Sequence, residues 1–259
     1  LGSNNQENWA LNFDGDEDYV IIPSSNSLDV TEYMTVMGWF KINSNDGWYI
    51  SLIDRTNNNG IYEGWRINLG PTLDSNCPYP NKINWSGLLN HDWSGPETYF
   101  NCPHTDEYSD EWVHVAGTFK NGRQELYING ELISVDNQNY NLVAYNNADL
   151  MFGYDLGKFP ELNGSPNPLY MYPQSYNGLM DEVAIWSEVL DENEIILHMN
   201  GDLEIDSNTV GYWKFDNGEG HILYDHTGNG NHGTIHGAQW ELRQQRLELP
   251  EWLTCSVSE

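Results

Sequence analysis

The sequence predicts an all-β protein, a two-sheet antiparallel β-sandwich (jelly roll) with one short helix and long aromatic-rich loop insertions. Short apolar or alternating runs recur along the chain, Gly and Asn turns separate them, and 11 Trp and 16 Tyr provide bulk for a sheet core. Many short strands with such turns are typical of sandwiches and jelly rolls. The predicted strands are 19–22, 35–42, 49–53, 65–69, 112–119, 125–128, 132–135, 150–152, 179–186 and 210–215.

Two Asn-Gly pairs predict tight hairpins in the middle of the chain. Asn121-Gly122 predicts a hairpin over 119–127, and Asn129-Gly130 predicts a second hairpin over 127–133. Both residues of such a turn need a positive φ, which Asn and Gly adopt most readily. We therefore expect three consecutive antiparallel strands here.

One helix is predicted after Asp191. Asp191 can accept hydrogen bonds at the helix start, and Glu194 stands three residues later, as in a capping box. Ile195, Ile196 and Met199 give the helix one apolar side, and it should end near Gly201.

The charge balance excludes two classes of partner. The chain has 10 Lys and Arg against 39 Asp and Glu, a formal net charge of −29. A field of that sign repels nucleic acid and anionic membranes. No apolar run approaches the roughly 18 residues that cross a bilayer, so membrane insertion is not expected either. Neutral or cationic ligands fit this surface better than polyanions.

Two segments, 71–110 and 158–176, interrupt the strand pattern and are predicted to be long loops. Loops of this length with many aromatic residues are often functional. Trp85 and Trp93 occur in repeated Trp-Ser-Gly sequences, and two interpretations stay open: a platform on which sugar rings stack, or a small core that packs the loop. The candidate ligand-binding residues are Tyr79, Trp85, Trp93, Tyr99, Tyr170 and Tyr172.

The cysteines leave two alternatives open, a disulfide formed in an oxidising compartment or free thiols. Cys77 and Cys102 stand in matching Asn-Cys-Pro sequences within the first insertion, and Cys255 is left over. A Cys77–Cys102 disulfide would close a loop of about 26 residues and contribute roughly 3–4 kcal/mol. Such a bridge predicts a location outside the cytoplasm, in a secreted or cell-surface protein.

Four phrases in the sequence resemble a known family. They are LNFDGDEDYV from Leu11, EWVHVAGTFKNGRQELYING from Glu111, GLMDEVAIW from Gly178 and VGYWKFDNGEGHILYDHTGNGNHG from Val210. Together they resemble the laminin-G-like jelly-roll domains of the concanavalin A-like lectin/glucanase superfamily. The resemblance implies one domain over 8–240, with the C-terminal strands in permuted order and 241–259 as a linker or tail. It also implies a non-catalytic binding module outside the cell.

A calcium site is predicted at the acidic cluster Asp14, Asp16, Glu17 and Asp18. Calcium prefers six to eight oxygen ligands, which clustered carboxylates can supply. The spacing excludes an EF-hand, because the sixth position from Asp14 is Tyr19 rather than Gly. The resemblance adds Asp181 as a ligand from the later strand. A weaker cation candidate is the turn that carries Asp225, Asn229 and Asn231.

Catalysis is not expected. The glucanase branch of the superfamily carries its carboxylates as E-x-D-x-x-E, which does not occur here, and no G-x-S-x-G sequence is present. The predicted function is a calcium-stabilised carbohydrate-binding module of a larger secreted or cell-surface protein, with a glycan or polysaccharide as its partner. The alternatives are an adhesion module that binds a surface protein, or a glycan-active enzyme with an unfamiliar site.

Overall fold

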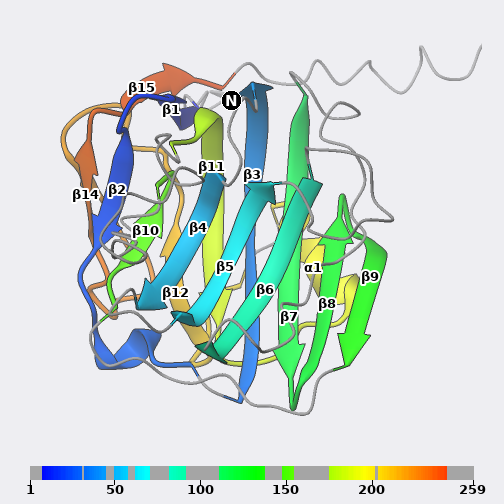
Figure 1. The fold of residues 1–259 in the computed structure, drawn as a ribbon. Coiled ribbons are helices and arrows are strands. Elements are labelled where there is room, and N and C mark those ends of the chain that lie inside the picture. Colours follow the sequence, from blue (N-terminus) through cyan, green and yellow to red (C-terminus); the bar gives the residue numbers. More distant parts are fainter. Residues whose placement is uncertain are drawn as a thin grey trace, which may run out of the picture.

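Two antiparallel β-sheets stack face to face and enclose the core (Figure 1). The computed structural model describes residues 8–30, 32–44, 50–57, 62–70, 82–91, 111–137, 148–154, 175–201 and 204–243. Within these ranges the predicted all-β sandwich with one helix is confirmed. The described part of the chain also contains a short 3-10 helix, η1 (Asn26–Leu28).

The first sheet, here called sheet A, has eight strands in the described part of the chain, in the order β15-β1-β11-β3-β7-β8-β9, with β12 also paired to β11. They are β1 (Trp9–Asp14), β3 (Tyr33–Ser44), β7 (Trp112–Lys120), β8 (Arg123–Ile128), β9 (Glu131–Asn137), β11 (Asn177–Trp186), β12 (Thr209–Trp213) and β15 (Gln239–Leu242). The second sheet, sheet B, has the order β13-β14-β2-β10-β4-β5-β6. Its strands are β2 (Tyr19–Ile22), β4 (Ile50–Asn57), β5 (Tyr62–Gly70), β6 (Lys82–His91), β10 (Leu150–Phe152), β13 (Ile222–Leu223) and β14 (Gly233–His236).

The C-terminal strands extend both sheets. Strand β12 pairs with the second half of β11, while β1 pairs with the first half. Strand β14 pairs with β2 in sheet B, and β15 pairs with β1 in sheet A. Segments from the two ends of the sequence therefore lie side by side at one edge of the sandwich (Figure 1).

The two Asn-Gly hairpins form as predicted. Asn121 and Gly122 have φ values of 49° and 81°, and Asn129 and Gly130 have 52° and 81°. The hairpins join β7 to β8 and β8 to β9. Positive φ at both central residues gives the turn a twist that matches the strands it joins.

The helix α1 (Glu192–Met199) also forms as predicted. Its Asp191 side chain accepts hydrogen bonds from the backbone N–H groups of Asn193 and Glu194, and the Glu194 side chain accepts from the backbone N–H of Asp191. Ile195 packs with Trp186 and Tyr127 on the outer face of sheet A. The capping box therefore fixes the start of a helix that covers part of this face.

The first insertion contains a strand where the sequence predicted only a loop. Strand β6 pairs with β5 and forms one edge of sheet B. Ile83 and Trp85 alternate with polar residues and are fully buried, as expected of an inward-facing strand side. An alternation of apolar and polar residues at Ile83 and Trp85 was thus present within a segment rich in Pro and Cys.

Candidate functional site

The acidic turn between β1 and β2 is closed by its own hydrogen bonds. The backbone N–H of Asp14 donates to Oδ2 of Asp18 at 2.9 Å, and the N–H of Asp16 donates to Oδ1 of Asp14 at 2.8 Å. Gly15 and Glu17 have positive φ values of 88° and 60°, which let the chain reverse. One oxygen each of Asp14 and Asp18 is therefore occupied by the backbone of the turn.

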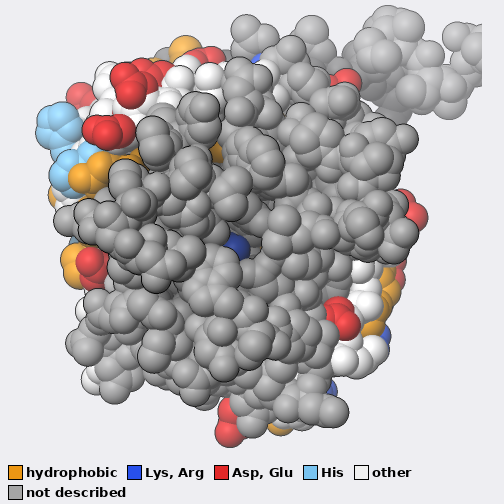
Figure 2. All heavy atoms as spheres, viewed as in Figure 1, with side chains coloured by type: hydrophobic (Ala, Val, Ile, Leu, Met, Phe, Trp, Pro, Cys, Tyr) orange, Lys and Arg blue, Asp and Glu red, His pale blue; other side chains and the backbone are white. Residues whose placement is uncertain are grey.

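Asp18 is the buried member of the acidic turn. Its side chain lies against Gly237, where a Cβ atom would stand 1.8 Å from Oδ1 of Asp18. Burial raises the pKa of Asp18, and the neighbouring carboxylate of Asp14 raises it further, although the backbone hydrogen bond from Asp14 lowers it. Acidic and histidine side chains gather at this corner of the molecule, over β2, β14 and β15 (Figure 2). The corner includes His236, which stacks on Tyr19 at 4.5 Å.

Asp181 does not join the acidic turn. Asp14 pairs with Asn177 at the start of β11, and Asp181 lies four residues further along that strand, a distance of about 13 Å. Its buried carboxylate accepts a hydrogen bond from Nη1 of Arg243 instead. Among the residues that the structure describes, no three His, Cys, Asp or Glu side chains form a group that could hold a metal ion. Asp181 is thus separated from the acidic turn, and calcium binding by Asp14, Asp16, Glu17 and Asp18 stays an untested prediction.

Arg243 extends the packed structure beyond the predicted boundary at residue 240. Its backbone N–H donates to the carbonyl of Asn8 at 2.8 Å. The guanidinium group lies 4.2 Å from the ring centre of Trp112 and 5.2 Å from that of Trp39. The two ends of the described chain are therefore joined on the outer face of sheet A.

Trp85 lies in the core, so its assignment to a sugar-binding platform is wrong. Its side chain is 0% exposed, and its Nε1 donates to the carbonyl of Thr118 at 3.0 Å. The indole fills the space over Gly117 in the opposite sheet, where a Cβ atom would come within 2.5 Å of it. The other predicted binding and disulfide residues lie outside the described ranges: Tyr79, Trp93, Tyr99, Tyr170, Tyr172, Cys77 and Cys102.

The weaker cation candidate is a structural turn. Oδ1 of Asp225 accepts from the backbone N–H groups of Tyr212 and Thr227, and Oδ2 accepts from the N–H of Asn231. The Asn231 side chain bonds to Ser25, Ser27 and the carbonyl of Val210. These donors occupy the oxygens that a cation would need, and they connect η1 to the C-terminal strands.

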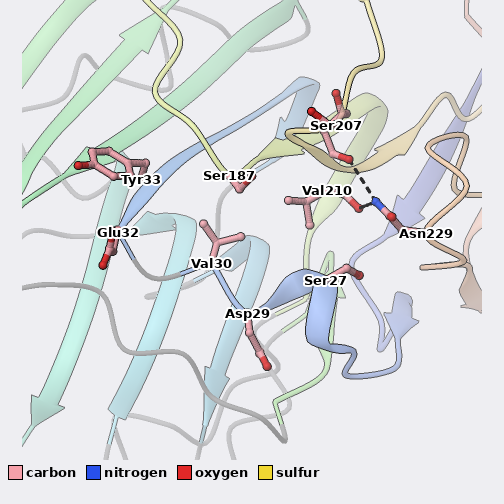
Figure 3. Close-up of a pocket in the computed structure, with 10 residues that line it drawn as sticks. Ser27, Asp29, Val30, Glu32, Tyr33, Ser187, Ser207, Val210 and Asn229 are labelled. Atoms are coloured by element: carbon pink, nitrogen blue, oxygen red, sulfur yellow. Dashed lines mark hydrogen bonds between the residues drawn. The ribbon is translucent and has the colours of Figure 1, made fainter.

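A polar pocket of about 390 Å³ lies beside this turn. Three segments far apart in the sequence form it: residues 27–33 around η1 and the start of β3, Ser187 at the end of β11, and residues 207–229 (Figure 3). The acidic turn precedes β2 and η1 follows it, so the two sites lie at opposite ends of the sandwich (Figure 1). The lining residues are Ser27, Asp29, Val30, Glu32, Tyr33, Ser187, Ser207, Thr209, Val210 and Asn229.

The pocket wall is held in place by hydrogen bonds and an ion pair. Nδ2 of Asn229 donates to the carbonyls of Thr209 and Val210, at 3.2 and 2.9 Å (Figure 3). Oδ1 of Asp29 lies 2.5 Å from Nη2 of the buried Arg55. Tyr33 stands at the edge of the pocket with 38% of its surface exposed. No motif marked these residues in the sequence, since they are ordinary loop residues that only the fold brings together.

The chain belongs to the Laminin_G_3 family, described as the concanavalin A-like lectin/glucanases superfamily. The family's sequence pattern matches residues 14–196 of the 259. The resemblance inferred from the four phrases is thereby confirmed. Comparison with curated proteins gives no match.

Several solved structures share the fold at low sequence identity. A proposed carbohydrate-binding protein from Bacteroides ovatus is 17% identical with a TM-score of 0.65, covering 93% of this chain and 61% of its own. A pentraxin from Limulus polyphemus is 15% identical with a TM-score of 0.50, and the match covers 75% of this chain and 82% of the pentraxin chain. Botulinum neurotoxin type C, whose cell entry depends on two ganglioside molecules, is 18% identical with a TM-score of 0.51, covering 76% and 43%. The chain thus spans less than two thirds of the Bacteroides ovatus protein.

The described part of the chain has one α-helix, of eight residues, and no helix there has the length and hydrophobicity needed to span a membrane.

Proposed function

We propose that this domain is a non-catalytic carbohydrate-binding module and that the polar pocket beside η1 is its binding site. The observation that carries the proposal is the composition of this pocket. Residues with hydroxyl, carboxylate and amide side chains, from three segments of the chain, line one hollow of about 390 Å³. That volume lies within the range of ligand sites, about 300–1,000 Å³.

The pocket offers both kinds of contact that a sugar needs. Sugar hydroxyl groups can hydrogen-bond to Ser207, Glu32 and Asn229 on its wall. The half-exposed ring of Tyr33 at the edge can pack against the apolar face of a sugar ring. Tyr33 is also steadied by Lys120, whose Nζ lies 5.7 Å from its ring centre. A rigid aromatic side chain contributes contact area at a small entropic cost.

The two carboxylates of the pocket do not form a glycosidase pair. Such a pair requires one protonated acid, shielded from water, and one ionised carboxylate. Asp29 forms an ion pair with the buried guanidinium group of Arg55, and Glu32 is exposed to solvent. Neither group is placed to serve as the general acid, so binding without hydrolysis is the function that this site supports.

The setting of the module is part of the same proposal. The family membership and the Asn-Cys-Pro pair support a module of a larger secreted or cell-surface protein. Calcium bound at the acidic turn would stabilise the fold from the end opposite the pocket. A protein partner is the alternative, and the binding experiment separates the two.

A glycan array probed in millimolar calcium tests the proposal, with a pocket variant and a matched control. Ser207→Trp places a large ring in the pocket from an exposed turn, and Glu131→Trp adds the same ring at an exposed hairpin. The proposal expects glycan hits for the wild type and the control, and their loss for Ser207→Trp. Hits that persist in Ser207→Trp would move the site elsewhere, and no hits at all would favour a protein partner.

A further inference from the structure

Most of the side-chain hydrogen-bond donors of the pocket are already used within the protein. Ser187 donates to the carbonyl of Asn208, and Thr209 donates to Oδ1 of Asp206. Ser27 donates to Oδ1 of Asn231. Nδ2 of Asn229 donates its hydrogens to the carbonyls of Thr209 and Val210. Among the lining residues, the hydroxyl groups of Ser207 and Tyr33 are side-chain donors that have no partner in the described part of the chain.

What the wall still offers a ligand is mostly acceptors. Oδ1 of Asn229 and Oδ2 of Asp29 have no partner among the described residues, and neither carboxylate oxygen of Glu32 has one. The lining contains no Lys, Arg or His. Asp29 forms an ion pair with Arg55, whereas Glu32 has no ion pair among the described residues. The complementary ligand is rich in donors and carries a positive charge.

Provided that the proposed function holds, we infer that the pocket takes an amino sugar whose ammonium group is free, in preference to a neutral or N-acetylated sugar. An ammonium group has three hydrogen-bond donors and no acceptor. It therefore complements a pocket wall on which most of the free groups are acceptors. Its charge also matches Glu32 and the net charge of −29. An acetamido group in the same place would remove the charge and add a carbonyl acceptor facing other acceptors.

The discriminating residue is Glu32, because it is exposed and has no hydrogen bond or ion pair among the described residues. Glu32→Gln keeps the size of the side chain and removes its charge. Glu131→Gln makes the same change in net charge at an exposed hairpin position far along the sequence. Any general attraction of a cation to an acidic protein is therefore equal in the two variants.

Isothermal titration calorimetry with three tetrasaccharides tests the inference: β-1,4-linked glucosamine, its N-acetylated form and β-1,4-linked glucose. The inference expects the glucosamine tetramer to bind wild type and Glu131→Gln at least tenfold more tightly than the other two. It also expects Glu32→Gln to lose about tenfold for that ligand alone. Equal binding of the three sugars, blocked by Ser207→Trp, would overturn the inference and leave the proposed function intact. An equal loss in Glu32→Gln and Glu131→Gln would overturn it too, as general attraction. Binding of none of the three, on a protein that binds other glycans through the pocket, would likewise overturn it.

Discussion

The guanidinium group of Arg243 forms an ion pair with the carboxylate of Asp181, which is 0% exposed. The two residues are 62 positions apart, and the pair joins the last described residue to the middle of β11. Trp39 and Trp112 shield the guanidinium on the outer face of sheet A. This contact, together with the pairing of β15 with β1, makes residues 241–243 part of the packed domain.

Removing Arg243 should destabilise the domain strongly. Arg243→Ala leaves the buried carboxylate of Asp181 without its cation, which typically costs about 3–5 kcal/mol. Urea unfolding at pH 9, above the raised pKa of about 8 of Asp181, measures the change. Arg123→Ala is the control, since its pair with Glu125 is 48% exposed on the Arg side and should contribute less than about 1 kcal/mol. Equal effects of the two variants would contradict the role of Arg243.

The free energy of unfolding should decrease as the pH rises, because Asp181 loses its proton. Burial raises the pKa of Asp181 to about 8, although Arg243 opposes the shift. A raised pKa means that the folded state binds the proton more tightly than the unfolded state does. The contribution of protonated Asp181 to the free energy of unfolding is therefore complete below about pH 4 and is lost as the pH rises through about 8.

Comparison with Asp181→Asn isolates this contribution from pH 4 to 9. Burial lowers the pKa of His114 to about 3, and His114 therefore destabilises the fold below about pH 6.5 in both proteins. The free energy of unfolding of the wild type should decrease relative to the variant as the pH increases. A constant difference across this range would show that Asp181 does not titrate there.

Trp85 should contribute to the stability of the folded domain. Trp85→Ala removes a fully buried indole and its hydrogen bond to Thr118, and a change of this kind costs about 3–5 kcal/mol. We expect a large loss of stability in urea unfolding and a lower melting temperature. A variant with unchanged stability and lost glycan binding would instead restore the platform interpretation.

Calcium should stabilise the domain through the acidic turn. An ion bound only by the folded state adds about 2.7 kcal/mol at a hundred times its dissociation constant. Melting in millimolar calcium and in chelator measures the effect, which Asp14→Asn with Asp16→Asn should remove. These residues are exposed, and Asp18 is left unchanged because it accepts the N–H of Asp14. Identical melting curves of the wild type in both solutions would exclude the site.

Local signals predicted the local structure well. The Asn-Gly pairs and the Asp191–Glu194 capping box each act within a few residues, and each formed as expected. Strand β6 was missed because Pro and Cys residues around it indicated a loop, although Ile83 and Trp85 alternate with polar residues.

The sites depend on contacts that no local pattern encodes. Asp181 meets Arg243 only because β15 returns to β1. The pocket forms only where η1, the end of β11 and the Asn229 turn meet, and its members are serines and acids of ordinary loops. The polar contacts of Asn231 likewise join segments about two hundred residues apart.

The most direct test of carbohydrate binding in the pocket is an NMR titration of isotopically labelled protein with the glucosamine and glucose tetrasaccharides. The pocket predicts that the largest shifts of backbone amide signals occur at Glu32, Ser187, Ser207 and Asn229, and that Ser207→Trp abolishes them. Shifts centred on other residues, or no shifts at ligand concentrations of several millimolar, would contradict it.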